Sequence, residues 1–276
     1  MKPLTAPSGD TAVPPLSSSR WAGLLGLGFF ANFLDTLGVG SFATTTAAFK
    51  LGKLVDDRDI PGTLNVGHSI PTIVEALIYI TVIKVELPTL VSMIAAGAFG
   101  AFFGARWVSG WSRLTIQRGL AIALLITAAI MMLRQLQFFP PGGDALGLTG
   151  VALAAAILAN AVIGSLASLG IGNYAPCMAV VSLLGMSPTA AFPIMMGSAA
   201  LILPAAASGF LASKRFDRRS AIALAIGGVP GVLVAALIVK SLPLDAVRWL
   251  VVVVLTYTSF MMFRSAKAES LARRTA

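Results

Sequence analysis

Two short glycine-rich steps, one in each half of the chain, carry the residues whose types and spacing could do chemistry. The first reads Leu-Gly-Val-Gly-Ser over 37–41, and the second reads Leu-Gly-Ile-Gly-Asn over 169–173. Glycine permits an unwound backbone, and a helix that restarts after such a break presents unpaired N–H groups and the positive end of its dipole. Two such helix starts that face each other predict an anion-binding site that needs no lysine.

We expect the substrate site to comprise residues of these steps and of the helix turns that follow them: Gly38, Gly40, Ser41, Thr44, Gly170, Gly172, Asn173, Tyr174 and Cys177. Ser41 and Asn173 occupy equivalent positions, and both are good N-caps that could also donate a hydrogen bond to a substrate oxygen. The Cys177 thiol could contact a sulfur anion, although a lone cysteine in a membrane is more often a small apolar residue. The alternative is that the glycines serve tight helix packing and the hydroxyl groups bond to their own backbone.

Three ionisable residues, Asp35, His68 and Glu75, fall inside the apolar segments or near their ends. Charge is costly there, so we expect these residues to act in coupling or gating. Asp35 would repel an anion, so we expect it to be protonated, to pair with His68 or Lys84, or to mark a coupling-ion site; the alternative is a helix end near the interface. His68 could relay a proton or simply form a hydrogen bond. Glu75 faces either a partner or a water-filled cavity.

The composition predicts that lipid surrounds these elements. Hydrophobic residues make up 57% of the chain and charged residues 11%, and the mean hydropathy is +0.88. Soluble domains carry about 25% charged residues, so this chain has too few to coat a water-facing globule. Long apolar runs at 120–133 and 250–263 exclude the alternating pattern of a β-barrel. The expected fold class is an all-α polytopic membrane protein.

Ten apolar segments are predicted to be helical: 21–37, 40–52, 64–83, 87–107, 116–136, 150–169, 172–185, 189–212, 221–239 and 247–263. The segments 40–52 and 172–185 are too short to cross a bilayer core of ~30 Å. Because each follows a glycine step, we expect each to be one arm of a hairpin broken inside the membrane. Three spans then follow each hairpin.

The glycine steps belong to a longer repeat. Residues 34–43 and 166–175 are identical at five of ten positions at a shift of 132, Pro61 matches Pro193 at the same shift, and a later G-x-x-G pair recurs at a shift of 131. A shift that stays constant across distant landmarks predicts two repeats, at 21–140 and 150–265. A disordered tail at 1–20 and a basic tail at 266–276 flank them.

Lysine and arginine residues predict the orientation. Sixteen of the 20 lie in the two tails and in the loops near 50–58, 106–118 and 214–219. The basic side of a membrane protein faces the cytoplasm, so we expect a multi-pass protein of the plasma (bacterial inner) membrane with both termini in the cytoplasm. The first hairpin then opens toward the cytoplasm and the second toward the outside. The two repeats are therefore expected to be inverted, as in many transporters.

Further motifs lie in the second half of the chain. Pro176 follows the glycine step, L-G-x-x-P-x-x-A spans 184–191, and Gly197-Ser198 comes after it. This series resembles the TauE/SafE family of sulfite exporters. The resemblance implies a secondary transporter for sulfite, organosulfonates or related sulfur anions that is coupled to a proton or sodium gradient.

Other function classes find little support in the sequence. An intramembrane serine protease needs a serine motif to partner His68, and an intramembrane aspartyl protease needs paired acids with a G-x-G-D motif, which the chain lacks. A single histidine and a single cysteine are too few for a clustered metal site. We therefore expect no enzyme, no cofactor and no resident metal. The alternatives are a carrier or channel for another small solute, such as a carboxylate or a metal ion, and a non-transporting membrane assembly factor.

The expected partners are a small anion, the lipid bilayer and a coupling ion, either a proton or sodium. The net charge of +9 is concentrated in loops that orient the chain and contact anionic headgroups, so we expect no nucleic acid. A homodimer is left open.

Overall fold

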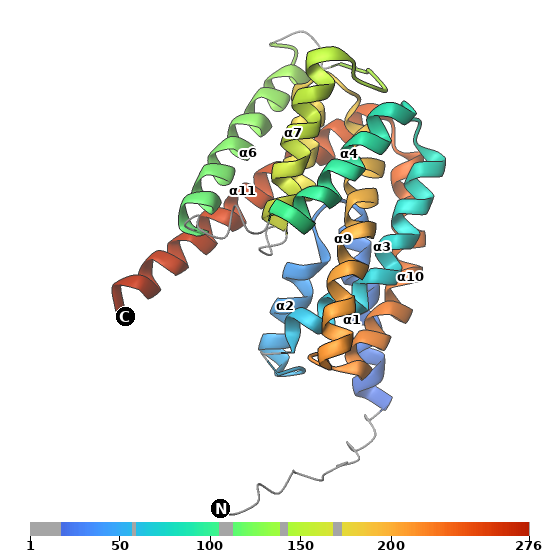
Figure 1. Ribbon diagram of the computed structural model, residues 1–276, viewed down its shortest axis with the longest axis vertical. Helices are drawn as coiled ribbons and strands as arrows, with labels where there is room; N and C mark the ends of the chain where they lie inside the picture. The colour runs from blue at the N-terminus through green and yellow to red at the C-terminus, as the bar shows by residue number, and fades with distance from the viewer. Residues whose placement is uncertain (1–17, 57–58, 105–112, 139–142, 168–172, 276) are drawn as a thin grey trace, which may run out of the picture.

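The computed structural model describes residues 18–56, 59–104, 113–138, 143–167 and 173–275 (Figure 1). Within these ranges the regular secondary structure is helical, apart from one isolated bridge between Ala145 and Met186. The helices are α1 (Ser18–Thr36), α2 (Ser41–Gly52), α3 (Ile60–Val82), α4 (Leu87–Phe99), a π-helix (Gly100–Gly104), α6 (Arg113–Gln135), α7 (Gly150–Ala167), α8 (Tyr174–Leu183), a 3-10 turn (Pro188–Ala190), α9 (Ala191–Ser213), α10 (Arg218–Ser241) and α11 (Leu244–Thr275).

All ten predicted segments coincide with a helix, and most ends agree within a few residues. The exception is α11, which continues to Thr275 and so includes most of the predicted basic tail at 266–276. Ala, Lys, Glu, Arg and Leu dominate this stretch, and all five are good helix formers, so nothing in the sequence stops the helix. The predicted disordered tail lies mostly outside the described residues.

Four helical stretches of the described chain are long and apolar enough to cross a membrane: Gly150–Ala167, Pro188–Ser213, Arg218–Ser241 and Asp245–Ala268. Large apolar side chains such as Leu158 and Leu237 are more than two-thirds exposed on them, which suits contact with lipid. The chain is thus an all-α membrane protein. The helices α1 and α3 are of similar length but carry buried polar side chains, including Asp35 and Glu75.

The first hairpin is broken where the sequence predicts. Helix α1 stops at Thr36 and α2 begins at Ser41, and Gly38 and Gly40 between them both have φ near +91°, a conformation that favours glycine. The chain then returns to the end at which α1 begins. A hydrogen bond shows this: the Arg20 Nη2 donates to the carbonyl of Leu54, just beyond α2, at 2.9 Å. The tip of this hairpin lies part-way along the molecule (Figure 1).

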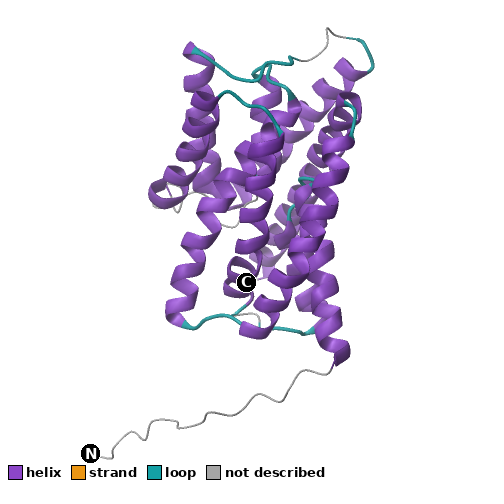
Figure 2. Ribbon diagram, turned by 90° about the vertical axis from the view of Figure 1, so that its right-hand side faces the viewer, coloured by secondary structure: helices purple, strands orange, loops and turns teal. Residues whose placement is uncertain are grey.

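The second hairpin, α7 and α8, opens toward the opposite end, at the top of Figure 1, where α7 begins. Figure 2 shows the bundle turned by 90°, with loops that join the helices at both ends. The amide of Ser187, just beyond α8, donates to the carbonyl of Ala145, just before α7, at 2.8 Å. The chain between Ala167 and Asn173 lies outside the described residues, and so do the predicted site residues Gly170 and Gly172. Tyr174, the first residue of α8, brings this hairpin close to the tip of the first one.

Glycines bring α1 and α10 into backbone contact. A Cβ atom on Gly227 or Gly231 of α10 would collide with the carbonyl of Leu25 or Phe29 of α1. Such small-residue packing is the usual way for helices to associate within lipid. The main core lies around α8 and α9, where Met178, Phe192 and Met195 are completely buried. The tips of the two hairpins are therefore held between tightly packed helices.

Candidate functional site

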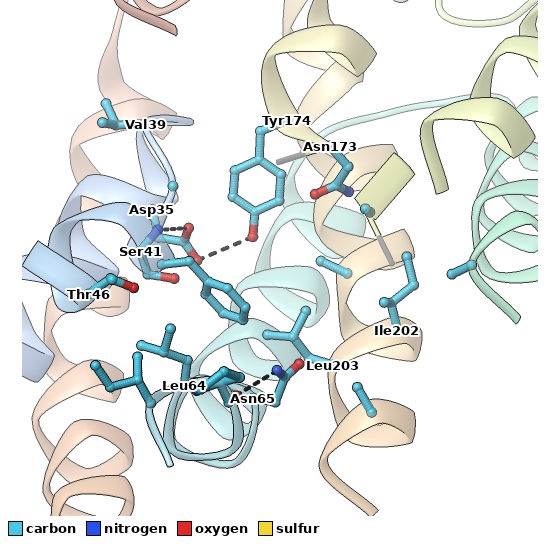
Figure 3. A pocket seen from close by; sticks show the side chains of 18 of the residues that line it. Asp35, Val39, Ser41, Thr46, Leu64, Asn65, Asn173, Tyr174, Ile202 and Leu203 are labelled. Atoms are coloured by element: carbon cyan, nitrogen blue, oxygen red, sulfur yellow. Dashed lines mark hydrogen bonds between the residues drawn. The ribbon is translucent and has the colours of Figure 1, made fainter. Parts of the chain in front are cut away.

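Asp35 joins the tips of the two broken hairpins. One oxygen of its carboxyl group, Oδ1, accepts the backbone amide of Ser41 at 2.6 Å, and the other, Oδ2, accepts the Tyr174 hydroxyl at 3.2 Å (Figure 3). The Asp35 residue is only 2% exposed. A side chain of this protein therefore already occupies the start of α2, where the sequence predicts a bound anion.

The N-cap position predicted for Ser41 is wrong, and the one predicted for Asn173 is confirmed without a side-chain capping bond. Gly40 holds the N-cap position of α2, and Ser41 is the first helical residue. A carboxylate is the stronger acceptor for a helix amide, so Asp35 takes the place of the hydroxyl. Asn173 does hold the N-cap position of α8, but its side chain forms no capping bond; its Nδ2 donates to the Met195 carbonyl at 3.3 Å instead.

A cavity of about 770 Å³ lies beside these two tips. Six of the predicted site residues line it: Asp35, Gly38, Gly40, Ser41, Asn173 and Tyr174. Its other walls include Leu64 and Asn65 from α3 and Ile202 and Leu203 from α9 (Figure 3). Among the described residues that line it, Asp35 is the single acidic and Lys50 the single basic side chain. The volume and lining suit a small polar solute.

Other predicted site residues lie outside this cavity lining. Thr44 of α2 is partly exposed and is absent from the described wall. Cys177 is completely buried in the core around α8 and α9, as expected for a small apolar residue. His68 and Glu75 are also completely buried. His68 lies before the middle of α3 and Glu75 after it.

His68 ties three helices together. Its Nδ1 lies 3.0 Å from the Asn32 Oδ1 of α1, and its Nε2 lies 3.1 Å from the Thr45 hydroxyl of α2. The Asn32 Nδ2 donates to the Gly28 carbonyl at 2.8 Å, which fixes the amide so that its oxygen faces the ring. Nδ1 is therefore the donor, and Nε2 accepts from Thr45.

The ion pairs considered for Asp35 do not form. His68 binds Asn32 and Thr45, and Lys84 is exposed beyond the end of α3. The partners of Asp35 are instead the amide and hydroxyl donors of Ser41 and Tyr174. Both neutral donors come from helices that start at the tips, which is why spacing along the chain did not indicate them.

Glu75 lies behind Asp35, away from the cavity. Its Oε1 accepts a short hydrogen bond from the Thr36 hydroxyl, and the Tyr79 hydroxyl donates to the Thr36 carbonyl at 2.9 Å. The other oxygen, Oε2, has no hydrogen-bond partner within the described ranges. Glu75 interacts electrostatically with Asp35. Glu75 is thus bonded to Thr36, the residue next to Asp35 in the chain.

Sequence reasoning missed Tyr79 and Lys50 as members of the site. A signal existed for Tyr79, because it lies one helical turn beyond Glu75 and so shares its face of α3. No local sequence pattern indicated that Lys50 lines the cavity, because its charge predicts only which side of the membrane its loop faces. Within the described part of the chain, no group of three or more His, Cys, Asp or Glu residues could hold a metal ion.

No protein-family model, curated protein or solved structure matches this chain. The resemblance to the TauE/SafE family therefore stays a prediction, and the function has to be inferred from the site itself.

Proposed function

We propose that this chain is a secondary transporter that carries a small anion across the plasma membrane. The observation that carries this proposal is the cavity lined by the tips of two broken hairpins. Asp35 of the first hairpin and Tyr174 of the second are hydrogen-bonded to each other in its wall. Irregular backbone at membrane depth is tolerated only where protein buries it or where it lines a cavity. Transporters place their substrate sites at such breaks.

An anion suits the donors around this cavity. Ser41, Asn65, Asn173 and Tyr174 bring hydroxyl and amide groups to its wall, and Lys50 brings an ammonium group. The first turn of α2 adds the positive end of a helix dipole. When Asp35 carries a proton, the charged side chains of the described lining sum to +1, and the site attracts a negative solute.

Paired helix contacts support an inverted repeat. A Cβ atom on Gly231 of α10 would meet the carbonyl of Phe29 in α1, and one on Gly100 would meet the carbonyl of Ala161 in α7. Phe29 and Ala161 are 132 positions apart, and the two glycines are 131 apart, which are the shifts of the sequence repeat. Among the described residues, three long helices follow each hairpin, and the hairpins open toward opposite ends. Rocking of one repeat against the other would then alternate access to the cavity.

The substrate class is taken from the resemblance to TauE/SafE exporters. We propose a sulfur oxyanion or organosulfonate such as sulfite, with no enzymatic activity. A carboxylate would use the same donors and is the nearest rival, whereas a metal ion would need ligands that this cavity does not gather among its described residues.

The test is ligand-induced stabilisation of the purified protein by sulfite, thiosulfate, methanesulfonate, acetate and divalent cations, each measured as a shift in the unfolding temperature. We expect sulfur anions to stabilise the protein by binding the folded state. Asn173→Leu should abolish the shift, and Lys50→Gln should weaken it. The matched control is Lys53→Gln, because Lys53 is a neighbouring exposed lysine that is not part of the described cavity wall.

Three results would overturn the proposal: unchanged binding in both cavity variants, stabilisation by acetate alone, or stabilisation by metal ions alone. The second result would assign the cavity to carboxylates and the third to cations.

A further inference from the structure

We propose that Asp35 and Glu75 hold one proton between them and exchange it with the cavity, so that proton movement is coupled to solute movement. The proton site rests on the burial of the two carboxyl groups, their hydrogen-bond partners and the unpaired oxygen of Glu75. The coupling rests in addition on the transport function proposed above.

The two carboxyl groups form a short relay from the cavity into the protein. Asp35 lines the cavity, while Glu75 is completely buried behind it and bonds to Thr36, the neighbour of Asp35. A hydronium ion in the cavity can therefore deliver its proton to Asp35 and leave as a neutral water molecule. The proton is then shared with Glu75, which is not part of the described cavity wall.

Within the described residues, no cation is paired with either acid. Asp35 of α1 faces Ser41 of α2 and Tyr174 of α8, and Glu75 of α3 faces Thr36 and is near Tyr79. The charged residues of α10 (Arg218, Arg219 and Lys240) lie at its two ends, and α9 contains none. Lys50 also lines the cavity, but among the described residues neither carboxyl group forms an ion pair.

Two uncompensated carboxylates in a buried site repel each other and lack the hydration that would stabilise them. A single shared proton removes one of the two charges. The proton is the smallest ion that can do so, and it needs no further ligands.

An independent observation points to the same proton. The Oε2 atom of Glu75 is buried and has no hydrogen-bond partner among the residues that the structure describes. A charged carboxylate oxygen left in this state is costly, because it loses its hydration without gaining a donor. A proton bound to the carboxyl pair removes that charge.

Protonation also acts on the contact between the hairpins. A charged Asp35 is a strong acceptor for the Tyr174 hydroxyl and the Ser41 amide, and a neutral one is a weaker acceptor. Loading the proton therefore loosens the link between the two tips and reduces the repulsion of an anion. Releasing the proton restores both.

Infrared difference spectroscopy tests the proton site without any substrate. Purified protein is titrated across pH, and the C=O stretch of protonated carboxyl groups is recorded. We expect a band that disappears in Glu75→Gln and shifts in Asp35→Asn, while Glu86→Gln, which alters an exposed acid before α4, leaves it unchanged. A band that is the same in all four proteins would overturn the proton site.

Sulfite uptake into proteoliposomes tests the coupling. We expect an inward proton gradient to drive accumulation that a protonophore abolishes. Glu75→Gln mimics the protonated state, so it should lose this accumulation but retain sulfite exchange, which also shows that the variant is folded. Accumulation that follows sodium and ignores the proton gradient would overturn the coupling. Absence of sulfite transport together with the expected infrared band would refute the proposed function and leave the proton site supported.

Discussion

The charge of Asp35 determines how strongly the start of α2 can attract an anion. Its carboxyl group receives donors from two different helices, and it is the single acidic group in the described wall of the cavity. A solute that approaches the Ser41 amide therefore meets either a competing carboxylate or a neutral acid. At the scale of the residue, binding of an anion and the charge of Asp35 have to be linked.

Thr36 is the residue through which this arrangement can be tested for stability. Its hydroxyl bonds to Glu75, so Thr36→Val would leave both oxygens of a completely buried carboxyl group without a donor. We expect the free energy of unfolding to fall by about 1–3 kcal/mol. Thermal or denaturant unfolding in detergent measures this loss.

The control for that change is Thr81→Val in α3. The Thr81 hydroxyl is exposed and bonds to carbonyls of its own helix, so its loss should change the stability by about 0.5 kcal/mol or less. Equal effects of the two substitutions would contradict the role given to Thr36.

At the scale of the element, glycines set how closely α1 and α10 approach. Gly231 faces the Phe29 carbonyl with no room for a Cβ atom, while Gly26 on the exposed side of α1 faces open space. The helix α1 carries Asp35, Asn32 and Thr36, so a displaced α1 would also displace the site. The position of the carboxyl pair thus depends on how closely α1 packs against α10.

Gly231→Ala should therefore destabilise the protein by about 1–3 kcal/mol, because the added methyl group forces the two backbones apart. Gly26→Ala is the matched control: it adds the same methyl group where nothing lies within 4 Å, so it should be neutral or slightly stabilising. Thermal unfolding of the two variants, side by side, measures the difference. A neutral Gly231→Ala would mean that α1 and α10 are farther apart than described.

At the scale of the whole molecule, the basic loops before α3 and before α10 lie at the same end. The Arg215 guanidinium lies 3.5 Å from Asp59, and the Asp217 amide donates to the Thr63 hydroxyl at 2.9 Å, so the loops before α3 and before α10 meet there. At the other end, Arg248 pairs with Asp144 at 2.6 Å. The proposed orientation assigns the first end to the cytoplasm.

Cysteine labelling tests this orientation. In a Cys177→Ser background, a membrane-impermeant maleimide added to intact cells should label the Lys240→Cys variant and not the Lys214→Cys variant. These two exposed lysines lie at opposite ends of α10: Lys214 precedes the helix, and Lys240 lies in its last turn. The reverse pattern would invert the assignment, and labelling of both would show that α10 does not cross the membrane.

The sequence by itself determined the class of the molecule and the first break in its helices. A low content of charge and long apolar runs are enough to require lipid as solvent, and glycines at 38 and 40 are enough to end α1, because these effects act locally along the chain. The ten helical segments follow from the same local patterns, and their ends differ where capping and packing decide. The inverted arrangement of the halves stays a prediction that the paired glycine contacts support.

The tertiary structure alone decided which groups meet. Tyr174 reaches Asp35 across 139 positions, and Glu75 reaches Thr36 across 39, distances at which no periodicity indicates a contact. The tertiary structure also sets the hydrogen bonds of His68 to Asn32 and Thr45. Lys50 lines the cavity, whereas Thr44 and Cys177 are not part of its described wall. The physical reason is that buried polar groups must find partners, and in a helical bundle those partners belong to neighbouring helices whose pairing only the packed fold sets.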